Sequence, residues 1–381
     1  MIGVVTVGRS DYGIYQPILR RIQADSELQL HLIVTGMHLS PEFGLTIKAI
    51  EADGFAIGDR VEMLLSSDSP EGIAKSMGLG IIGMAQAYAR AKPEVLVVLG
   101  DRFEMHAAAL AALPFKIPVA HIHGGELTEG AIDDALRHSL TKLSHLHFVS
   151  TQEYADRVVQ LGEESWRVKV SGAPALDNLR TVKLLSMEEM AKRFNLPADQ
   201  HPLLVTFHPV TLEYEQAALQ TEELLAALSE FDLPIVFTMP NADTGGRIIS
   251  RMLEQFSRDR ESVRMVDNLG TEGYFSMMNM AAVMVGNSSS GIIEAASFRL
   301  PVVNIGTRQR GRVSASNVIH VGYNRAEITK GIETALQPEF KSGLAQLRNP
   351  YGDGHAAERI VDALKDVALD DNLIRKRFHN L

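Results

Sequence analysis

Short β-branched segments alternate with longer helical patterns along most of the chain, and this alternation restricts the fold more than any other feature. Several of the segments are apolar throughout, which is typical of parallel strands buried on both faces. Alternating strands and helices predict an α/β fold with parallel sheets. The expected strands are Ile2–Val7, Leu30–Val34, Val95–Leu99, Pro118–Ile122, Leu146–Val149, Leu203–Phe207, Pro234–Thr238, Val263–Val266, Ala282–Val285, Pro301–Ile305 and Val318–Val321. The expected helices include Tyr12–Ala24, Gly72–Ala91 and Gln216–Ser229.

So many strands exceed what one doubly wound sheet commonly holds. The turn-forming stretch Gly172-Ala173-Pro174 divides them, and a length of 381 residues agrees with about two domains of ~100–200 residues each. We therefore predict two Rossmann-like doubly wound domains, residues 1–172 and 173–354, with a helix in 355–381 that packs back on the first. Because ligands of such sheets bind at the carboxyl ends of the strands, we expect the site in a cleft between the two sheets.

The composition narrows the range of partners. A formal net charge of -10 disfavours contact with phosphate backbones, so we expect no nucleic-acid partner, although a local basic pocket can still hold a small anion. No apolar run reaches the ~18 residues of a membrane span, and the first residues lack a signal-peptide pattern, so we expect a cytoplasmic protein without a membrane partner. The absence of cysteine excludes disulfides, thiolate metal sites and cysteine nucleophiles.

Two glycine-rich segments have the spacing of cofactor motifs but not their context. Residues 78–83 fit the dinucleotide fingerprint, yet no strand precedes them and they lie in a helical pattern rich in Ala and Met. Residues 306–311 have P-loop spacing, yet Arg312 and Val313 stand where Lys and Ser/Thr are required. We interpret the first segment as a site of helix packing and expect no cofactor.

A turn of small polar residues, 286–291, follows the expected strand Ala282–Val285 and starts a helical pattern. Free backbone amides at a helix start, together with serine hydroxyls, can bind a phosphate group, and Glu294 can accept hydrogen bonds from ribose hydroxyls. The predicted ligands are Ser288, Ser289, Ser290, Gly291 and Glu294. The alternative interpretation is a serine N-cap without a ligand.

An arginine-rich loop, Thr307–Arg312, follows the next expected strand and should end at the same edge of the sheet. Its three arginines, with Arg308 first among them, could neutralise a diphosphate. A solvated basic loop is the alternative. The first strands of the two halves also end in polar residues, Arg9 in one half and His208 in the other, and Asn241 and Asp243 follow a further strand. A buried structural histidine and an ordinary helix start are the alternatives for His208 and for the segment 241–245.

Acidic residues and histidines gather where the strands of the first half end. The candidates are Asp101, His123, Glu126 and Asp133. Carboxylates that crowd together have split pKa values, so one can serve as an acid while another serves as a base. The alternatives are helix capping by the two aspartates and metal binding by His121 and His123. We favour acid–base roles over metal binding for these residues and predict no metal site.

Taken together, these motifs resemble the hydrolysing UDP-N-acetylglucosamine 2-epimerases of sialic-acid-type sugar pathways. The resemblance covers nearly the whole chain. It runs through Arg9-Ser10-Asp11-Tyr12, Val34–His38, Gly100-Asp101-Arg102, His121–Glu126, Asp133, Arg137-His138-Ser139, Phe207-His208-Pro209, Asn241, Asp243, Asn287–Gly291 and Gly306–Gln309.

The resemblance implies a two-domain glycosyltransferase-B fold. It implies that water and UDP-N-acetylglucosamine give N-acetylmannosamine and UDP, through elimination to a glycal and then hydration, for sialic or nonulosonic acid synthesis. No cofactor is implied. The implied acid–base residues are Asp101, His123, Glu126 and Asp133. The implied substrate-binding residues are Arg9, His38, Arg102, His208, Asn241, Asp243, Ser288, Ser289, Ser290, Gly291, Glu294 and Arg308.

Several alternatives stay open at this point. The same chemistry could act on a UDP- or GDP-linked 2,4-diacetamido-trideoxy sugar. Non-hydrolysing 2-epimerases share the fold but lack the Gly124-Gly125-Glu126 pattern. A glycosyltransferase of the same fold needs one base, whereas several acids gather here, and a non-catalytic binding protein would need none. We expect a nucleotide-sugar partner and a homo-oligomer, either a dimer or a tetramer.

Overall fold

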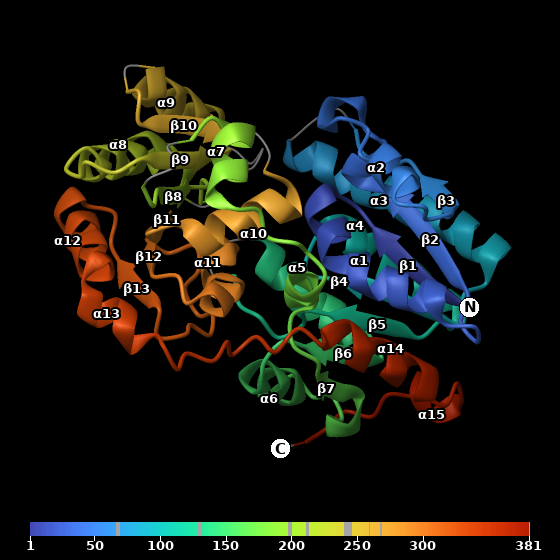
Figure 1. The fold of residues 1–381 in the computed structure, drawn as a ribbon. Coiled ribbons are helices and arrows are strands. Elements are labelled where there is room, and N and C mark those ends of the chain that lie inside the picture. Colours follow the sequence, from blue (N-terminus) through green and yellow to red (C-terminus); the bar gives the residue numbers. More distant parts are fainter. Residues whose placement is uncertain are drawn as a thin grey trace. The chain divides into compact units, whose positions relative to one another are not determined.

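Parallel strands build both sheets of the computed structural model, which describes residues 1–65, 69–128, 132–196, 200–210, 213–239, 246–258, 260–266 and 269–380. The chain divides into two units (Figure 1). Unit 1 comprises Met1–Glu126, Ile132–Asn178 and Tyr351–Leu381, and unit 2 comprises Leu179–Pro350 with Leu127–Ala131. The division expected from the sequence, after residue 172 and before residue 355, lies a few residues away from these bounds.

Unit 1 is built on a sheet with the strand order β3-β2-β1-β4-β5-β6-β7. Its strands are β1 (Ile2–Thr6), β2 (Leu30–Thr35), β3 (Ile57–Val61), β4 (Val95–Leu99), β5 (Val119–Ile122), β6 (Leu146–Val149) and β7 (Val168–Val170). Its α-helices are α1 (Arg9–Ala24), α2 (Ile47–Ala52), α3 (Pro70–Ala91), α4 (Phe103–Ala112), α5 (Ile132–Leu143), α6 (Gln152–Gln160), α14 (Ala356–Asp366) and α15 (Asp371–Ile374). The strand order reverses between β1 and β4, and such a switch point is where doubly wound sheets bind their ligands.

Unit 2 repeats the design with the strand order β10-β9-β8-β11-β12-β13. Its strands are β8 (Leu203–Thr206), β9 (Ile235–Thr238), β10 (Val263–Val266), β11 (Val283–Gly286), β12 (Val302–Ile305) and β13 (Val318–Val321). Its α-helices are α7 (Met187–Phe194), α8 (Ala217–Leu228), α9 (Gly246–Arg258), α10 (Gly270–Met280), α11 (Ser289–Ile293), α12 (Arg325–Leu336) and α13 (Pro338–Gly343). The switch point of this sheet lies between β8 and β11.

Helices cover the sheets because the strands are apolar on both faces. All residues of β1 and β4 are buried, as a parallel strand between two helical layers requires. In unit 1, α1 packs against α14 and α3 packs against α4; in unit 2, α8 packs against α9 and α12 (Figure 1). None of the helices in the described ranges is long and apolar enough to span a bilayer.

Helix α14 belongs to unit 1 because specific contacts hold it there. Both carboxylate oxygens of Asp177 accept backbone N–H groups at its start, from Ala356 at 2.9 Å and from Ala357 at 2.7 Å. This carboxylate satisfies donors that every helix start leaves open. The hydroxyls of Tyr154 and Tyr351 lie 2.8 Å apart in the same region.

All the strands expected from the sequence are present, with ends that differ by no more than about one residue. The strands β3 and β7 were not expected, and they are the two edges of the first sheet. The glycine segment 78–83 lies inside α3, as expected for helix packing. A Cβ on Gly80 would come within 2.5 Å of Met63, and one on Gly83 within 2.5 Å of Val61, so glycine lets this helix lie close to its neighbours.

Candidate active site

A buried arginine joins two of the predicted acids of unit 1. Arg137, on α5, is 3% exposed, and its Nη2 donates to Oδ2 of Asp101, which follows β4. Its Nη1 lies 3.5 Å from Oε2 of Glu126. Burial lowers the pKa of Arg137, but the two carboxylates raise it more strongly, so the net shift is upward. The guanidinium therefore stays charged and holds both carboxylates at one place.

His123 completes this network. Its Nδ1 lies 2.6 Å from Oε1 of Glu126, and the Ser150 hydroxyl lies 2.9 Å from the same nitrogen while donating to Glu126 Oε1 at 3.2 Å. The backbone φ of His123 is +64°, in the left-handed region that non-glycine residues adopt rarely. Such a conformation persists only where the surroundings enforce it, and it is often found at functional sites. The structure thus brings Asp101, Glu126 and His123 together.

Asp133 lies in the first turn of α5, four residues before Arg137, and is partly buried. His121, on β5, is by contrast fully buried. Its Nε2 lies 2.7 Å from the carbonyl oxygen of Gly100, and burial lowers its pKa to about 3, so it is neutral. No group of three His, Asp or Glu side chains in the described part of the chain is arranged to hold a metal ion.

A second charged group lies at the switch point of unit 1. Arg102 binds Glu104 through Nη2 at 3.0 Å and Nε at 3.2 Å, and Glu104 is fully buried. Burial lowers the pKa of Arg102, but the carboxylates of Glu104, Asp11 and Asp101 together raise it more strongly. The net shift of this pKa is upward, so the guanidinium also stays charged. Arg9, which was predicted to bind substrate, lies at the start of α1 and is exposed.

His38 is buried at the end of β2 with both ring nitrogens occupied. Nε2 lies 2.9 Å from the Thr6 hydroxyl and Nδ1 lies 2.7 Å from the Thr46 hydroxyl. Burial lowers its pKa to about 4, so the ring is neutral near pH 7. His38 thus links Thr6, at the end of β1, with Thr46, and a direct contact with a ligand would compete with one of these hydrogen bonds.

In unit 2, the side-chain amide of Asn287 fixes the backbone of His208. Its Oδ1 accepts from the His208 N–H at 2.7 Å and its Nδ2 donates to the His208 carbonyl at 2.8 Å. Burial, with a smaller effect of Arg308, lowers the pKa of His208 to about 3, so the imidazole is neutral. Gly286 allows this arrangement, because a Cβ there would lie 1.9 Å from the Thr206 carbonyl oxygen.

The predicted serine turn follows β11 directly. Ser288 caps the short helix α11, its hydroxyl accepting from the Ser290 N–H at 3.4 Å. Ser289, Gly291 and Glu294 lie in or next to this helix, and Glu294 is partly buried. The Tyr274 side chain from α10 lies close to those of Ser290 and Ser288. The turn is therefore both a serine cap and a cluster of hydroxyl groups at the switch point of the sheet.

The three arginines of loop 306–312 lie in two different places, so they do not form the single basic group expected from the sequence. Arg308 Nη1 donates to the Asn287 carbonyl at 3.1 Å, and Gln309 Nε2 donates to the same oxygen at 2.9 Å, so Arg308 lies against the serine turn. Arg310 and Arg312 instead line a hollow of about 600 Å³ between this loop and the end of β13. Glu213 holds the loop by accepting hydrogen bonds from Thr307 and Tyr323, both at 2.7 Å.

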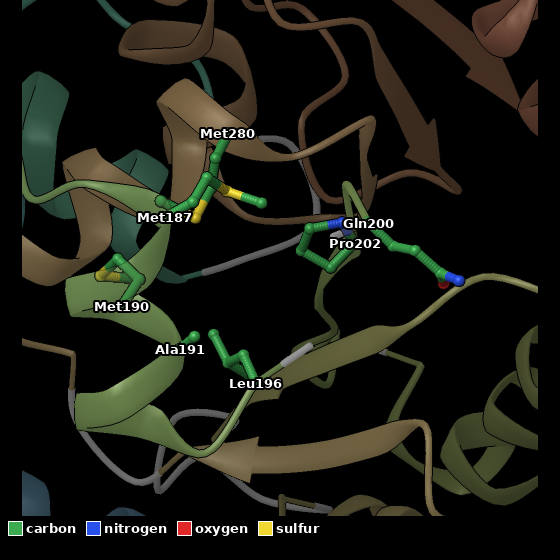
Figure 2. A pocket seen from close by; sticks show the side chains of 7 residues that line it. All are labelled: Met187, Met190, Ala191, Leu196, Gln200, Pro202 and Met280. Carbon is green, nitrogen blue, oxygen red and sulfur yellow. The ribbon is translucent and has the colours of Figure 1, made fainter. Parts of the chain in front are cut away.

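A smaller hollow lies under α7 and carries no chemistry. It is lined by Met187, Met190, Ala191, Leu196, Gln200, Pro202 and Met280 (Figure 2). Its volume of about 10 Å³ holds at most one water molecule. Two predicted substrate ligands, Asn241 and Asp243, lie outside the described residues.

Sequence reasoning left several important side chains out of the predicted site. Arg137 and Asn287 stood inside recognised motifs without a role, although each joins two predicted residues. The sequence carried one weak signal for Arg137, because it follows Asp133 by four residues, a spacing at which an arginine and an acid can pair on a helix. Asp11 and Glu104 were also left out, and both are buried beside Arg102.

The fold and the site can now be compared with those of known proteins, and the comparison identifies the protein family. A family model described as UDP-N-acetylglucosamine 2-epimerase matches residues 20–365. A solved structure of this activity, UDP-GlcNAc 2-epimerase from Neisseria meningitidis bound to UDP-GlcNAc, aligns with a TM-score of 0.84 at 20% identity, covering 96% of this chain and 100% of that one. The chain therefore has a glycosyltransferase-B-like fold and belongs to the UDP-N-acetylglucosamine 2-epimerase family.

Curated relatives narrow this class to its hydrolysing enzymes. The chain is 38% identical to the GDP/UDP-N,N'-diacetylbacillosamine 2-epimerase (hydrolyzing) of Campylobacter jejuni, over 100% of this chain and 99% of the relative. It is 36% identical to the UDP-N,N'-diacetylbacillosamine 2-epimerase (hydrolyzing) of Legionella pneumophila, over 98% and 97%. The protein is an enzyme of the hydrolysing nucleotide-sugar 2-epimerase kind. A glycosyltransferase and a non-catalytic binding protein are no longer needed as alternatives.

Proposed function

We propose that the protein hydrolyses a nucleotide-linked 2,4-diacetamido-trideoxy sugar and inverts its carbon two, releasing the free sugar and a nucleoside diphosphate. The observation that carries the chemistry is the Asp101–Arg137–Glu126 network, because the buried Arg137 holds the partly exposed Asp101 carboxylate and the buried Glu126 carboxylate in place for proton transfer. The choice of sugar is supported by the two hydrolysing relatives, both of which are named for diacetylbacillosamine.

The order of steps follows from the chemistry of the sugar. The hydrogen on carbon two is not next to a carbonyl, so a carboxylate cannot remove it unaided. Departure of the nucleoside diphosphate gives carbon one the character of an oxocarbenium ion, and the neighbouring hydrogen then becomes acidic. Its removal forms a glycal. Water then adds to carbon one while an acid returns a proton to carbon two on the other face, so at least two proton-carrying groups are needed.

Unit 1 would supply the proton-carrying groups. Asp101 and Glu126 are held at one place by Arg137, and His123 is bonded to Glu126. Asp133 lies one helical turn before Arg137 and is a further candidate. The strained backbone of His123 and the burial of Glu126 support a rigid, preorganised arrangement, which keeps proton donors and acceptors in place without reorganisation.

Unit 2 would hold the nucleotide. The hydroxyls of Ser288, Ser289 and Ser290 and the Arg308 guanidinium lie at the switch point and can donate to a diphosphate, whose departure they would stabilise. Glu294 can accept from ribose hydroxyls. His208 is neutral and rigidly held by Asn287, so it can serve as a hydrogen-bond partner whose position does not change.

UDP-N-acetylglucosamine is the second candidate substrate, and it was first in the sequence analysis. It is supported by the matching family model and by the fold of the Neisseria meningitidis enzyme. The two substrates differ at carbons four and six, so the same proton-transfer chemistry serves both. UDP- and GDP-linked forms of the diacetamido sugar are both considered, because the Campylobacter jejuni relative is named for both nucleotides.

Kinetics on three substrates tests the proposal. The purified protein is incubated separately with UDP-diacetylbacillosamine, GDP-diacetylbacillosamine and UDP-N-acetylglucosamine, and kcat/KM is measured by release of the nucleoside diphosphate. We expect a preference of at least about tenfold for a diacetamido substrate, which corresponds to ~1.4 kcal/mol. Proton NMR in deuterated water should show deuterium at carbon two of the product. Preference for UDP-N-acetylglucosamine would establish the second candidate instead.

A further inference from the structure

Glu213 is a charged side chain of unit 2 to which neither the sequence motifs nor the proposed function assign a role. It lies between the end of β8 and the start of α8, a few residues after His208. Its Oε1 accepts from the Thr307 hydroxyl at 2.7 Å, and its Oε2 accepts from the Tyr323 hydroxyl at 2.7 Å and from Nε2 of Gln220 at 3.0 Å. One partly buried carboxylate thus joins the segments that follow β8, β12 and β13.

The hydrogen bonds of Glu213 hold the start of loop 306–312 firmly. Burial raises the pKa of Glu213, but these hydrogen bonds lower it more strongly, so the carboxylate is charged. Hydrogen bonds to a charged acceptor are stronger than those between neutral groups. The Tyr323 hydroxyl also accepts the backbone N–H of Thr307 at 3.1 Å. Gly306, with a φ of +74°, makes room for this arrangement, because a Cβ there would overlap the Tyr323 ring.

Glu213 closes a ring of hydrogen bonds among three loops that follow the neighbouring strands β8, β11 and β12. The loop after β11 is bonded to the loop after β8, because the Asn287 side chain binds the N–H and the carbonyl of His208. The loop after β12 is bonded to the loop after β11, because Arg308 and Gln309 both donate to the Asn287 carbonyl. Glu213 joins the loop after β12 to the segment after β8.

The ring matters for binding because its loops carry His208, the serine turn and Arg308, which are proposed nucleotide ligands. An arginine side chain is long and flexible, so a ligand that has to order it first is bound less tightly. Folding has already ordered Arg308 here. Its guanidinium donates to the Asn287 carbonyl at 3.1 Å, and the residue before it, Thr307, is bonded to Glu213.

We propose that Glu213 is a positioning residue: by binding Thr307 it fixes loop 306–312, and thereby the Arg308 guanidinium, for the diphosphate of the nucleotide. The inference rests on the proposed function, which gives Arg308 this ligand. Glu213 contributes to nucleotide affinity only through Arg308. Its removal should therefore weaken binding as long as Arg308 is present and should have little effect once Arg308 is absent.

A double-mutant cycle on the Kd for UDP tests this dependence. Glu213→Ala alone should raise the Kd by roughly 5- to 10-fold, because the loop loses its hydrogen bonds. In the Arg308→Ala background the same change should raise the Kd by less than about twofold, since the group that Glu213 positions is already absent. Glu213→Gln should restore most of the affinity, because an amide can accept from one hydroxyl and donate to the other. Glu222→Ala, an exposed change on α8, is the matched control and should leave the Kd unchanged.

Hydrogen exchange of the nucleotide-free protein, followed by mass spectrometry, reports on the loop itself. The peptide that contains residues 306–312 should exchange at least about tenfold faster in Glu213→Ala than in the wild type, while peptides of the unit 1 sheet stay unchanged. Glu213→Gln should exchange like the wild type. Thr307→Val removes the same hydrogen bond from its donor side and should also speed exchange, so it replaces Glu213→Ala if that protein does not fold.

Unchanged exchange of the loop in these variants would overturn the inference, as would an equal rise in Kd with and without Arg308. If the wild type releases nucleoside diphosphate from none of the three nucleotide sugars, the proposed function fails by that result. The exchange of residues 306–312 then still decides whether Glu213 holds the loop.

Discussion

The charged and polar groups of the two units differ in how far they are buried and in how accessible they are to a ligand. In unit 1, Arg137, Glu126 and Glu104 are almost fully buried, and each has a charged partner within the unit: Arg137 pairs with Glu126, and Glu104 pairs with Arg102. In unit 2, the candidate ligand groups are serine hydroxyls at a helix start and arginines on a loop, and Arg310 is exposed beside an open hollow. Proton transfer needs groups whose ionisation is controlled by burial, whereas binding a charged ligand needs donors that are still accessible.

The largest effect that would sharpen this comparison is expected for Asp101→Asn. The change keeps the shape of the side chain but weakens a proton acceptor, so kcat should fall by roughly 100-fold or more. The affinity for UDP, measured by calorimetric titration, should stay within about twofold, because the nucleotide groups lie in the other unit. Asp156→Asn, an exposed change on α6, is the control. Near-normal kcat in the folded Asp101→Asn protein would show that the chemistry lies elsewhere.

The double variant Ser289→Ala/Arg308→Ala should mainly lose affinity for UDP, whereas Asp101→Asn should mainly lose kcat. Losing a charged hydrogen bond to a ligand costs about 1.5–3 kcal/mol, so the Kd for UDP should rise by roughly 10- to 150-fold. The kcat at saturating substrate should fall less than in Asp101→Asn. Arg251→Ala on α9 provides a control that removes an exposed arginine of the same unit. An unchanged Kd in the double variant would place the diphosphate somewhere else in unit 2.

A smaller effect is expected on the pH dependence of stability. Because burial lowers the pKa of His208 from 6.5 to about 3, this residue stabilises the fold above pH 6.5 and loses that contribution as the pH falls. Between pH 6.5 and 5 the loss amounts to about 2 kcal/mol at ~1.4 kcal/mol per pH unit. The thermal unfolding of His208→Gln should therefore depend less on pH in this range than that of the wild type. Parallel curves for the two proteins would contradict a buried, neutral His208.

The smallest effect, no change at all, is expected from metal removal. Arg308 and the hydroxyl groups of the serine turn already offer donors to a diphosphate, so a divalent ion is not required for its charge. After exhaustive chelation, kcat should equal that of the untreated enzyme. A lost activity that one divalent metal restores would mean that the site of unit 2 is incomplete as described.

The buried strands were predictable from the sequence and the edge strands were not, for a physical reason. A strand between two helical layers is apolar at every position, as in Val95–Leu99, and this pattern is hard to mistake. The edge strands β3 (Ile57–Val61) and β7 (Val168–Val170) carry charged residues and are partly exposed. Edge strands commonly carry such charges, which discourage pairing with other chains, so their pattern resembles that of a loop.

The same contrast applies to the site. Residues that follow a buried strand, such as Asp101 and His208, were placed correctly at strand ends from the sequence. The partners that decide their chemistry come from elsewhere in the chain: Arg137 from α5 and Asn287 from the end of β11. Pairings over such separations depend on how helices pack, which periodicity does not report. Glu213 likewise meets Thr307 and Tyr323, which lie 94 and 110 residues further along the chain, and no pattern in the sequence reveals these contacts.

The way in which α14 completes unit 1 has a consequence for biosynthesis. Domains generally fold as units while the chain emerges from the ribosome. Unit 2 is nearly continuous in sequence, so it can fold before the segment Tyr351–Leu381 has been made. Unit 1 cannot complete its fold before that segment has been made, because α14 covers α1 and because the Asp177 carboxylate caps the start of α14. The half of the enzyme that is translated first is therefore the half that is finished last, and its unfinished apolar surface is what chaperones would meet during synthesis.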